Sequence, residues 1–217
     1  MPPPCPVTSK DIQTSDPFSQ SHRTVKYVVD SPEVPMTFLA CGPSRRGAIP
    51  FAPIRALPTL FQIEAISCAR KSIFVQSPNL TSRGILKAIK GALLKSVAVE
   101  IYLPRNMMVL DSLITGWATT ACRVKSLQKW AKKQGQADLK VNWFKSDNSQ
   151  EFLVEGEKSH IKFMVVDEEL VVVGSSNLDR ASACTSGEVN VAISDAEVAR
   201  LLIAAVKRHQ ATGTGDI

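Results

Sequence analysis

The side chains best suited to chemistry begin at His160. His160 and Lys162 are separated by one residue, so on an extended strand their side chains leave on the same face. We expect Ile161 and Phe163 to point the other way, into the core. A neutral imidazole beside an ammonium is a poor pair for structure alone. It suits a site that binds an anion and attacks it, with the ammonium on a phosphate oxygen and the imidazole as nucleophile or acid–base group.

A second polar group follows a tight turn between two predicted strands, 161–166 and 170–173. This hairpin brings Gly174, Ser175 and Asn177 back beside the first strand. A glycine there lets backbone approach closely, and a hydroxyl and an amide are neutral donors for phosphoryl oxygens. Glu188 comes at the mouth of the next strand, where its carboxylate could orient His160 and favour one tautomer.

Each of these residues also has a structural explanation. A lone histidine on a strand is often a satisfied polar residue, and Lys162 could extend from the edge of the core. The residues 174–177 could form a turn alone, and we assign Asp167 a structural role as the cap of the hairpin. For each residue by itself the structural explanation is favoured. Together, these explanations account poorly for six kinds of residue at fixed spacing along the chain.

The spacing matches a known pattern without a gap. The chain has the order His160-x-Lys162-x₄-Asp167-x₆-Gly174-Ser175-x-Asn177. It resembles the H-x-K-x₄-D-x₆-G-S-x-N (HKD) motif of the phospholipase D superfamily, and the Glu188 position fits that pattern too. The likeness also includes residues 69–80 and 187–191. Over roughly residues 45–210 the chain resembles the C-terminal half of fungal phospholipase D-like proteins.

The resemblance implies a reaction and roles for the residues. In that family two such motifs meet at one active site, where one histidine forms a phosphohistidine and the other protonates the leaving alcohol. No metal or other cofactor is needed. The resemblance implies that His160 is the nucleophile or the general acid and that Glu188 orients it. It implies that Lys162, Ser175 and Asn177 bind the phosphate. Asp167 and Gly174 are then structural positions of the motif.

A second motif is missing from the sequence. His22 is followed by lysine four residues on instead of two, and no Gly-Ser-x-Asn follows, so we treat it as a decoy. We expect His209 to favour the C-terminus of the last helix. Three explanations remain: the second motif comes from a homodimer partner, it belongs to a missing N-terminal half of a longer chain, or the lobe is inactive. The second explanation is favoured.

Strand and helix patterns alternate around the motif. The helical repeat of apolar residues predicts helices at 57–69, after Thr81/Ser82 and in the basic segment 117–134. A capping box at 194–197 predicts the start of a final helix. Short apolar runs predict strands at 72–76, 97–103, 139–144, 161–166, 170–173 and 189–193. This alternation predicts an α/β fold. With the resemblance, it becomes a single phospholipase D-like lobe, a mixed β-sheet flanked by helices on both faces. We expect an irregular lead-in or linker at 1–45, the lobe at 46–210 and a flexible tail at 211–217.

The charge and hydropathy of the chain limit the kinds of partner that it can bind. The 217 residues carry a net charge of +6, and residues 70–145 hold 14 basic against 3 acidic residues. The segment 117–134 is therefore a candidate for peripheral contact with an anionic membrane or nucleic acid. No apolar run approaches the ~20 residues of a membrane span, and the first residues do not resemble a secretory signal. We expect an intracellular protein, cytoplasmic or peripheral to a membrane.

These observations predict a phospholipase D-like phosphodiesterase or phosphatidyltransferase. Its substrate would be a phospholipid or another phosphodiester. The alternatives from the same residues are a metal-independent nuclease and an inactive half-domain that still binds phosphate.

Overall fold

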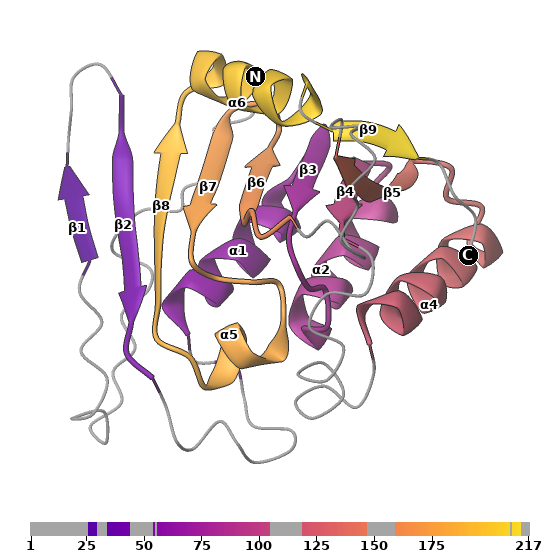
Figure 1. Ribbon diagram of the computed structural model, residues 1–217, viewed down its shortest axis with the longest axis horizontal. Helices are drawn as coiled ribbons and strands as arrows, with labels where there is room; N and C mark the ends of the chain where they lie inside the picture. Colours follow the sequence, from indigo (N-terminus) through magenta and orange to yellow (C-terminus); the bar gives the residue numbers. More distant parts are fainter. Residues whose placement is uncertain are drawn as a thin grey trace.

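The computed structural model describes residues 26–29, 34–43, 54, 56–104, 119–146, 159–208 and 210–213 (Figure 1). Its strands are β1 (Lys26–Val29), β2 (Met36–Cys41), β3 (Ser72–Gln76), β4 (Ala98–Leu103), β5 (Leu139–Ser146), β6 (Phe163–Val166), β7 (Leu170–Gly174), β8 (Glu188–Ser194) and β9 (Gln210–Gly213). Its helices are α1 (Leu57–Cys68), α2 (Arg83–Leu93), α4 (Thr120–Lys133), α5 (Arg180–Cys184) and α6 (Ala196–Arg208).

The strands form one mixed sheet in the order β1-β2-β8-β7-β6-β3-β4-β5-β9. The neighbours β3, β4 and β5 run parallel, and every other pairing is antiparallel. The predicted α/β class with a mixed sheet is confirmed. Because β3 pairs with both β4 and β6, the centre of the sheet joins the parallel part to the hairpin that carries the motif.

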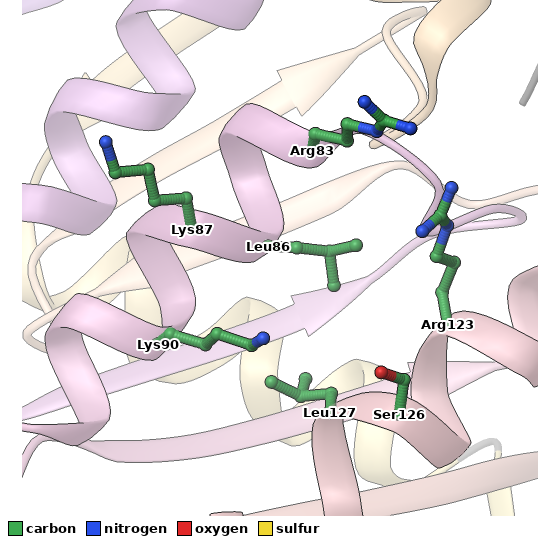
Figure 2. Close-up of a pocket in the computed structure, with 7 residues that line it drawn as sticks. All are labelled: Arg83, Leu86, Lys87, Lys90, Arg123, Ser126 and Leu127. Atoms are coloured by element: carbon green, nitrogen blue, oxygen red, sulfur yellow. The ribbon is translucent and has the colours of Figure 1, made fainter. Parts of the chain in front are cut away.

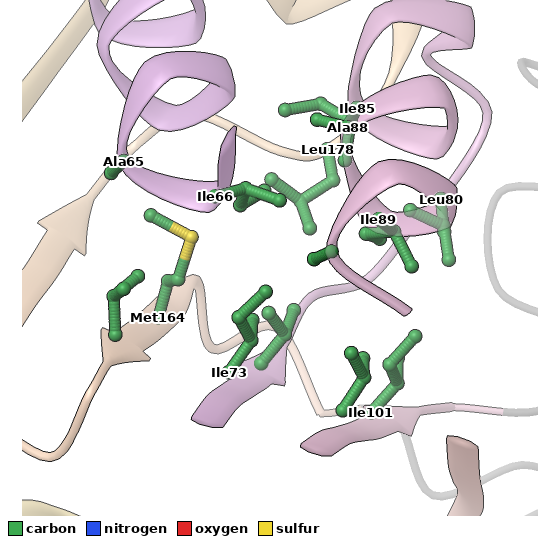
Figure 3. Close-up of a cluster of buried hydrophobic side chains, with 14 of the residues drawn as sticks. Ala65, Ile66, Ile73, Leu80, Ile85, Ala88, Ile89, Ile101, Met164 and Leu178 are labelled. Atoms are coloured by element: carbon green, nitrogen blue, oxygen red, sulfur yellow. The ribbon is translucent and has the colours of Figure 1, made fainter. Parts of the chain in front are cut away.

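Alternating side chains divide the core into two layers. Ile73 and Val75 face the layer filled by α1, α2 and α4, and Phe74 between them faces the layer under α6. Figure 3 shows the first layer, in which Met164 of β6 lies next to Ala65 and Ile66 of α1. Helices therefore flank both faces of the sheet, as expected. Within the described residues, no helix combines the length and apolarity that crossing a bilayer requires.

The boundary expected at residue 45 is wrong, because β2 belongs to the sheet. Its six residues pair antiparallel with β8, and Leu39 is 1% exposed within the core. The sequence signal is weak here because most other β2 side chains are only partly buried. The expected tail is also wrong in part, since Gln210–Gly213 form β9 on the edge of β5.

The remaining expected elements fall close to their predicted positions. The helix at 194–197 begins one residue later than a cap at Ser194 implies, because Asp195 Oδ1 accepts from Val198 N at 2.7 Å. The basic helix is described as Thr120–Lys133. The loop expected at 105–116 and the histidines His22 and His209 lie outside the described residues.

Candidate active site

The candidate site lies at the edge of the sheet where β3 ends and β6 begins. Phe163, the first residue of β6, pairs with Gln76, the last residue of β3. Gln76 Nε2 donates to Ser159 Oγ at 2.7 Å, and both residues are buried. This bond fixes the chain before His160, so the next residues emerge at the edge of the sheet.

His160 and Lys162 are brought together as expected. Lys162 Nζ lies 2.8 Å from His160 Nδ1 and 3.1 Å from Nε2, and it donates to the His160 carbonyl oxygen at 2.9 Å. An ammonium has hydrogens and no lone pair, so an imidazole nitrogen that accepts from it must be unprotonated. His160 is exposed and Lys162 is half-buried. The pair therefore presents an imidazole and a cation together to a ligand approaching from solvent, and the contact between them must open before the ring nitrogen can attack.

The expectation that both Ile161 and Phe163 point into the core is wrong for Ile161. Phe163 is buried beneath α6, but Ile161 is 45% exposed. The reason is that β6 begins at Phe163, so Ile161 stands beyond the end of this strand. His160 and Lys162 are held by the hydrogen bond between Gln76 and Ser159 and by the bond from Lys162 Nζ to the His160 carbonyl oxygen, rather than by a strand.

Two opposing effects act on the Lys162 ammonium. Desolvation by burial lowers its pKa from the ordinary lysine value, and this effect outweighs the carboxylates of Glu188 and Asp179, which raise it. The neutral amine therefore appears at a lower pH than in an exposed lysine. A cation that loses its charge early on the alkaline side will also lose its hold on an anionic substrate early.

This shift predicts a pH dependence of substrate binding. KM for a phosphodiester should rise with pH through a midpoint below that of an ordinary lysine, because Lys162 deprotonates there. Lys162→Arg keeps its charge throughout and should remove this rise. Steady-state kinetics across pH test it, with Lys125→Arg on the exposed face of α4 as the matched control. A rise that survives Lys162→Arg would assign the titration to another group.

Ser175, Glu188 and Gly174 meet where β7 passes β8. Ser175 Oγ donates to Glu188 Oε2 at 2.5 Å and accepts from Val189 N at 2.9 Å. The strand register explains the contact, since Gly174 pairs with Asn190 and the next residues along each strand lie beside one another. The Ser175 hydroxyl proton is thus engaged with Glu188, and a phosphoryl oxygen would have to replace that bond.

Glu188 does not hold His160 as the sequence suggested. Among the hydrogen bonds of the described residues, its carboxylate accepts from Ser175, and its charge acts on Lys162. The β7–β8 register, continued by one residue, places Val189 across from Ser175, and the adjoining Glu188 then comes within reach of the Ser175 hydroxyl, which sequence spacing alone does not show. Orientation of His160 by Glu188 therefore remains a prediction for the assembled, substrate-bound site.

Gly174 allows the two strands to approach closely. A Cβ at this position would collide with the Val189 carbonyl oxygen and the Asn190 amide oxygen, and would lie 2.6 Å from Asn190 Cα. These atoms belong to a paired strand and a buried side chain, so they cannot move aside cheaply.

Gly174→Ala should therefore lower the free energy of unfolding by about 2 kcal/mol, as overpacking typically does. Gly91→Ala is the control, because nothing lies within 4 Å of its added Cβ. That change in helix α2 should stabilise the protein by up to about 1 kcal/mol. Urea denaturation of both variants tests the pair, and equal stability of Gly174→Ala and wild type would contradict the collision.

The Asn177 amide is oriented by a residue to which sequence analysis gave no role. Asn177 Nδ2 donates to Asp179 Oδ2 at 3.1 Å, and Asn79 Nδ2 donates to the same oxygen at 3.3 Å. A carboxylate accepts only, so the Asn177 amide nitrogen must face Asp179. Asp179 is 4% exposed and also caps α5 by accepting from Ser182 N at 2.8 Å. It therefore joins the motif loop to α5 and to the loop after β3.

Leu178 anchors the same loop in the core. It is 3% exposed and lies near Ile85 and Ile89 of α2 in Figure 3. Its carbonyl oxygen accepts from Thr81 N and Ser82 N, and its own N–H donates to Ser77 Oγ. The loop after β3 thus supports the motif loop. The Ser-Pro-Asn run after that strand was visible in the sequence, but nothing in it indicates a partner about a hundred residues away.

Asp167 lies at the opposite end of β6 from His160. Its Oδ1 accepts from the backbone N–H groups of Arg70, Lys71 and Ser72 at 3.0, 2.7 and 3.1 Å. Its φ is +55°, a conformation that aspartate tolerates better than most residues. The carboxylate thus ties the β6–β7 turn to the start of β3, at a distance from the reacting groups.

The described site combines an imidazole, an ammonium and neutral polar groups at one edge of the sheet. Within the described ranges no group of three histidine, cysteine or acidic residues is arranged to hold a metal ion. The chemistry that this arrangement can perform is binding of a phosphodiester and attack by His160 on phosphorus.

Comparison with known proteins gives the class. Residues 62–210 match the family described as "Cardiolipin synthase, PLD-like domain". The chain therefore belongs to the phospholipase D-like family, which confirms the resemblance seen in the sequence. It is 33% identical over 141 residues to cardiolipin synthase of Staphylococcus aureus strain N315, an alignment covering 64% of this chain and 24% of that one. Cardiolipin synthase 2 of Staphylococcus epidermidis strain ATCC 12228 is 35% identical over 141 residues, covering 64% and 25%.

The chain spans about a quarter of the length of these curated relatives. They are bacterial, and the narrower resemblance to fungal proteins stays a prediction.

Solved structures share the fold. NucT from Helicobacter pylori superposes with a TM-score of 0.57 at 15% identity, covering 81% of this chain and 95% of that one. Phosphatidylserine synthase of Haemophilus influenzae Rd KW20 has a TM-score of 0.59 at 12% identity, covering 83% of this chain and 40% of that one. The same lobe thus corresponds to nearly all of one solved chain and to less than half of another.

Proposed function

We propose that this chain is a phospholipase D-like lobe that hydrolyses or transfers phosphatidyl groups at phospholipid phosphodiester bonds. The observation that carries the proposal is the His160–Lys162 contact of 2.8 Å at an open edge of the sheet, beside Asn177 and Ser175. The match to cardiolipin synthases supports a phospholipid as the substrate.

The reaction needs two imidazoles. The lone pair of one attacks phosphorus, the bond from phosphorus to the leaving oxygen breaks, and the second imidazole, protonated, gives that oxygen a proton. An acceptor alcohol or water then attacks phosphorus, returns a proton to the second imidazole, and the P–N bond breaks. Lys162 would neutralise a phosphoryl oxygen throughout, with Asn177 and Ser175 as neutral donors.

We propose that the second imidazole comes from another lobe with the same motif. A homodimer would place two copies of His160 across a two-fold axis, and a longer parent chain would supply the same group in one molecule. The lengths covered in NucT and in phosphatidylserine synthase are compatible with both arrangements.

Turnover in EDTA tests the function. The full chain is incubated with phosphatidylglycerol in detergent micelles and ethanol, and phosphatidylethanol is measured by mass spectrometry. A protein lacking the His160 imidazole is the blank. We expect product above the blank, with a rate that rises faster than linearly with protein concentration if two copies form the site. Product equal to the blank at every protein concentration would contradict a site formed by two copies of this chain, and cleavage of DNA under the same conditions would favour the nuclease.

A further inference from the structure

A basic groove lies between helices α2 and α4, away from the candidate site. It encloses about 350 Å³ and is lined by Arg83, Leu86, Lys87, Lys90, Arg123, Ser126 and Leu127. In Figure 2, Arg83 and Arg123 come from different helices and extend toward the same end of the groove, and Lys90 lies nearer the other end. Four cationic residues thus line a groove whose floor includes two leucines, Leu86 and Leu127, although the Lys87 ammonium points away from the other three cations in Figure 2.

The charge of the groove is not balanced by either helix. Neither Arg83–Leu93 nor Thr120–Lys133 contains an aspartate or glutamate. On α2 the cations stand at positions 83, 87 and 90, which the helical repeat places in one stripe. Such a stripe beside a second basic helix is complementary to a surface dense in phosphate.

The same stripe ends in an exposed apolar side chain. Leu94 follows Lys90 by four residues and Lys87 by seven, so it continues the line of cations, and it is 59% exposed. The apolar face of α2 is buried in the core, but Leu94 is free to enter the acyl chains of a bilayer while the cations in line with it hold the headgroups. Nucleic acid would gain little from this leucine.

The aromatic side chain near the groove also disfavours nucleic acid. Single-stranded nucleic acid is held on basic grooves by free aromatic faces on which bases stack. Trp130 of α4 has Lys90 Nζ over its ring at 5.1 Å from the centroid, so that face is already occupied. The groove supplies charge and apolar contact without an open stacking platform.

The groove is connected to the site through the loop that precedes α2. Arg83 opens this helix three residues after Leu80, which bridges to Leu178 of the motif loop. Thr120 opens α4 and donates to the Asn79 amide oxygen at 3.3 Å. Both helices therefore begin next to the motif loop. A bilayer along α2 would bring headgroup phosphates to the edge of the sheet where His160 lies.

We propose that the α2–α4 groove and Leu94 form a docking surface for an anionic phospholipid bilayer. The surface holds headgroup phosphates between the two helices and inserts Leu94 among the acyl chains. The inference rests on the proposed function in one respect only, the choice of a phospholipid substrate. Membrane binding is measured without turnover, so the two proposals can fail separately.

Charge removal with a matched control tests the groove. The triple variant Lys87→Gln, Lys90→Gln, Arg123→Gln is compared with Lys125→Gln, Lys129→Gln, Lys132→Gln. Both sets lose three positive charges, and the control set lies on the exposed side of α4. Sedimentation with phosphatidylcholine vesicles containing phosphatidylglycerol measures partitioning. Because each basic residue at an anionic surface contributes about fivefold, the groove variant should lose about 100-fold and the control much less.

Leucine removal tests insertion independently of charge. Leu94→Ser should lower partitioning about tenfold, the contribution of one buried leucine side chain. Leu201→Ser is the control, since Leu201 is 53% exposed on α6, on the other face of the sheet. Circular dichroism melting confirms that each variant is folded.

The outcomes decide between the possible partners. Equal losses for the groove and control sets, or unchanged binding of Leu94→Ser, would overturn the docking surface. A groove variant that binds vesicles normally but loses affinity for single-stranded DNA would overturn it in favour of nucleic acid. Vesicle binding that depends on the groove, in a chain without turnover, would leave this inference standing while the proposed function fails.

Discussion

His160→Ala should lower phosphatidyl transfer by about 10⁴-fold or more, because in the proposed function this imidazole either forms the bond to phosphorus or protonates the leaving oxygen. Lys162 is 2.8 Å from that ring, so the variant leaves an ammonium able to bind the substrate but unable to react with it. KM should therefore change much less than kcat. If both imidazoles come from His160 in a homodimer, the loss is larger still, since one substitution removes nucleophile and general acid together.

Two controls separate this loss from a general disturbance. Ile161→Ala alters the next residue, whose side chain is 45% exposed, and should keep nearly full activity. His22→Ala removes the decoy histidine and should also be active. Activity retained by His160→Ala, or lost equally by Ile161→Ala, would contradict the proposed role of His160. Phosphohistidine trapped by acid-free quenching in wild type, and absent from His160→Ala, would support it directly.

Asp167→Ala will lower the free energy of unfolding by about 3 kcal/mol. Although Asp167 belongs to the HKD motif, we expect the substitution to affect stability rather than the reaction. Its carboxylate accepts three backbone N–H groups at the start of β3, and hydrogen bonds to a charged acceptor are worth more than neutral ones. Alanine is also strained at a φ of +55°. For a domain of this size the melting temperature should fall by about 6–12 °C.

Variants at the same turn divide this effect into its parts. Asp167→Asn tolerates the same φ and keeps one oxygen acceptor without the charge, so it should lose about half as much stability. Glu168 has a φ of +59°, and among the described residues its side chain forms no hydrogen bond to β3, so Glu168→Ala should change little. Well below its melting temperature Asp167→Ala should keep near-normal kcat, because Asp167 lies at the far end of β6 from His160. A large loss of kcat with unchanged stability would make Asp167 part of the reaction instead.

The parts of the fold that could be predicted from sequence are those with a strong local pattern. Helix α2 has an apolar face that recurs every three to four residues, and β3, β4 and β7 are short apolar runs. Strand β2 was missed because burial along it is partial, apart from Leu39. It is a strand because β8 offers it an edge, which is information from the other end of the chain.

The candidate site divides in the same way. His160 and Lys162 are two residues apart, so their contact follows from local geometry. The contact of Asn177 with Asp179 is equally local, but two others are not: Glu188 reaches Ser175 because β7 and β8 are paired, and Asp179 also binds Asn79, a hundred residues away. The sequence suggested that Glu188 orients His160, because the spacing of residues can be read from the sequence but the register between β7 and β8 cannot.

The sequence by itself determined the types and order of the reactive groups, the class of fold and the family, since all of these depend on local spacing. The tertiary structure alone decided which groups bond to which. Asp167 reaches the N–H groups of β3, and the cations of α2 and α4 line one groove, because packing of the sheet and helices joins segments far apart in the chain. Such contacts depend on strand register and helix docking, which reflect the free energy of the whole fold and leave no mark in any short stretch of sequence.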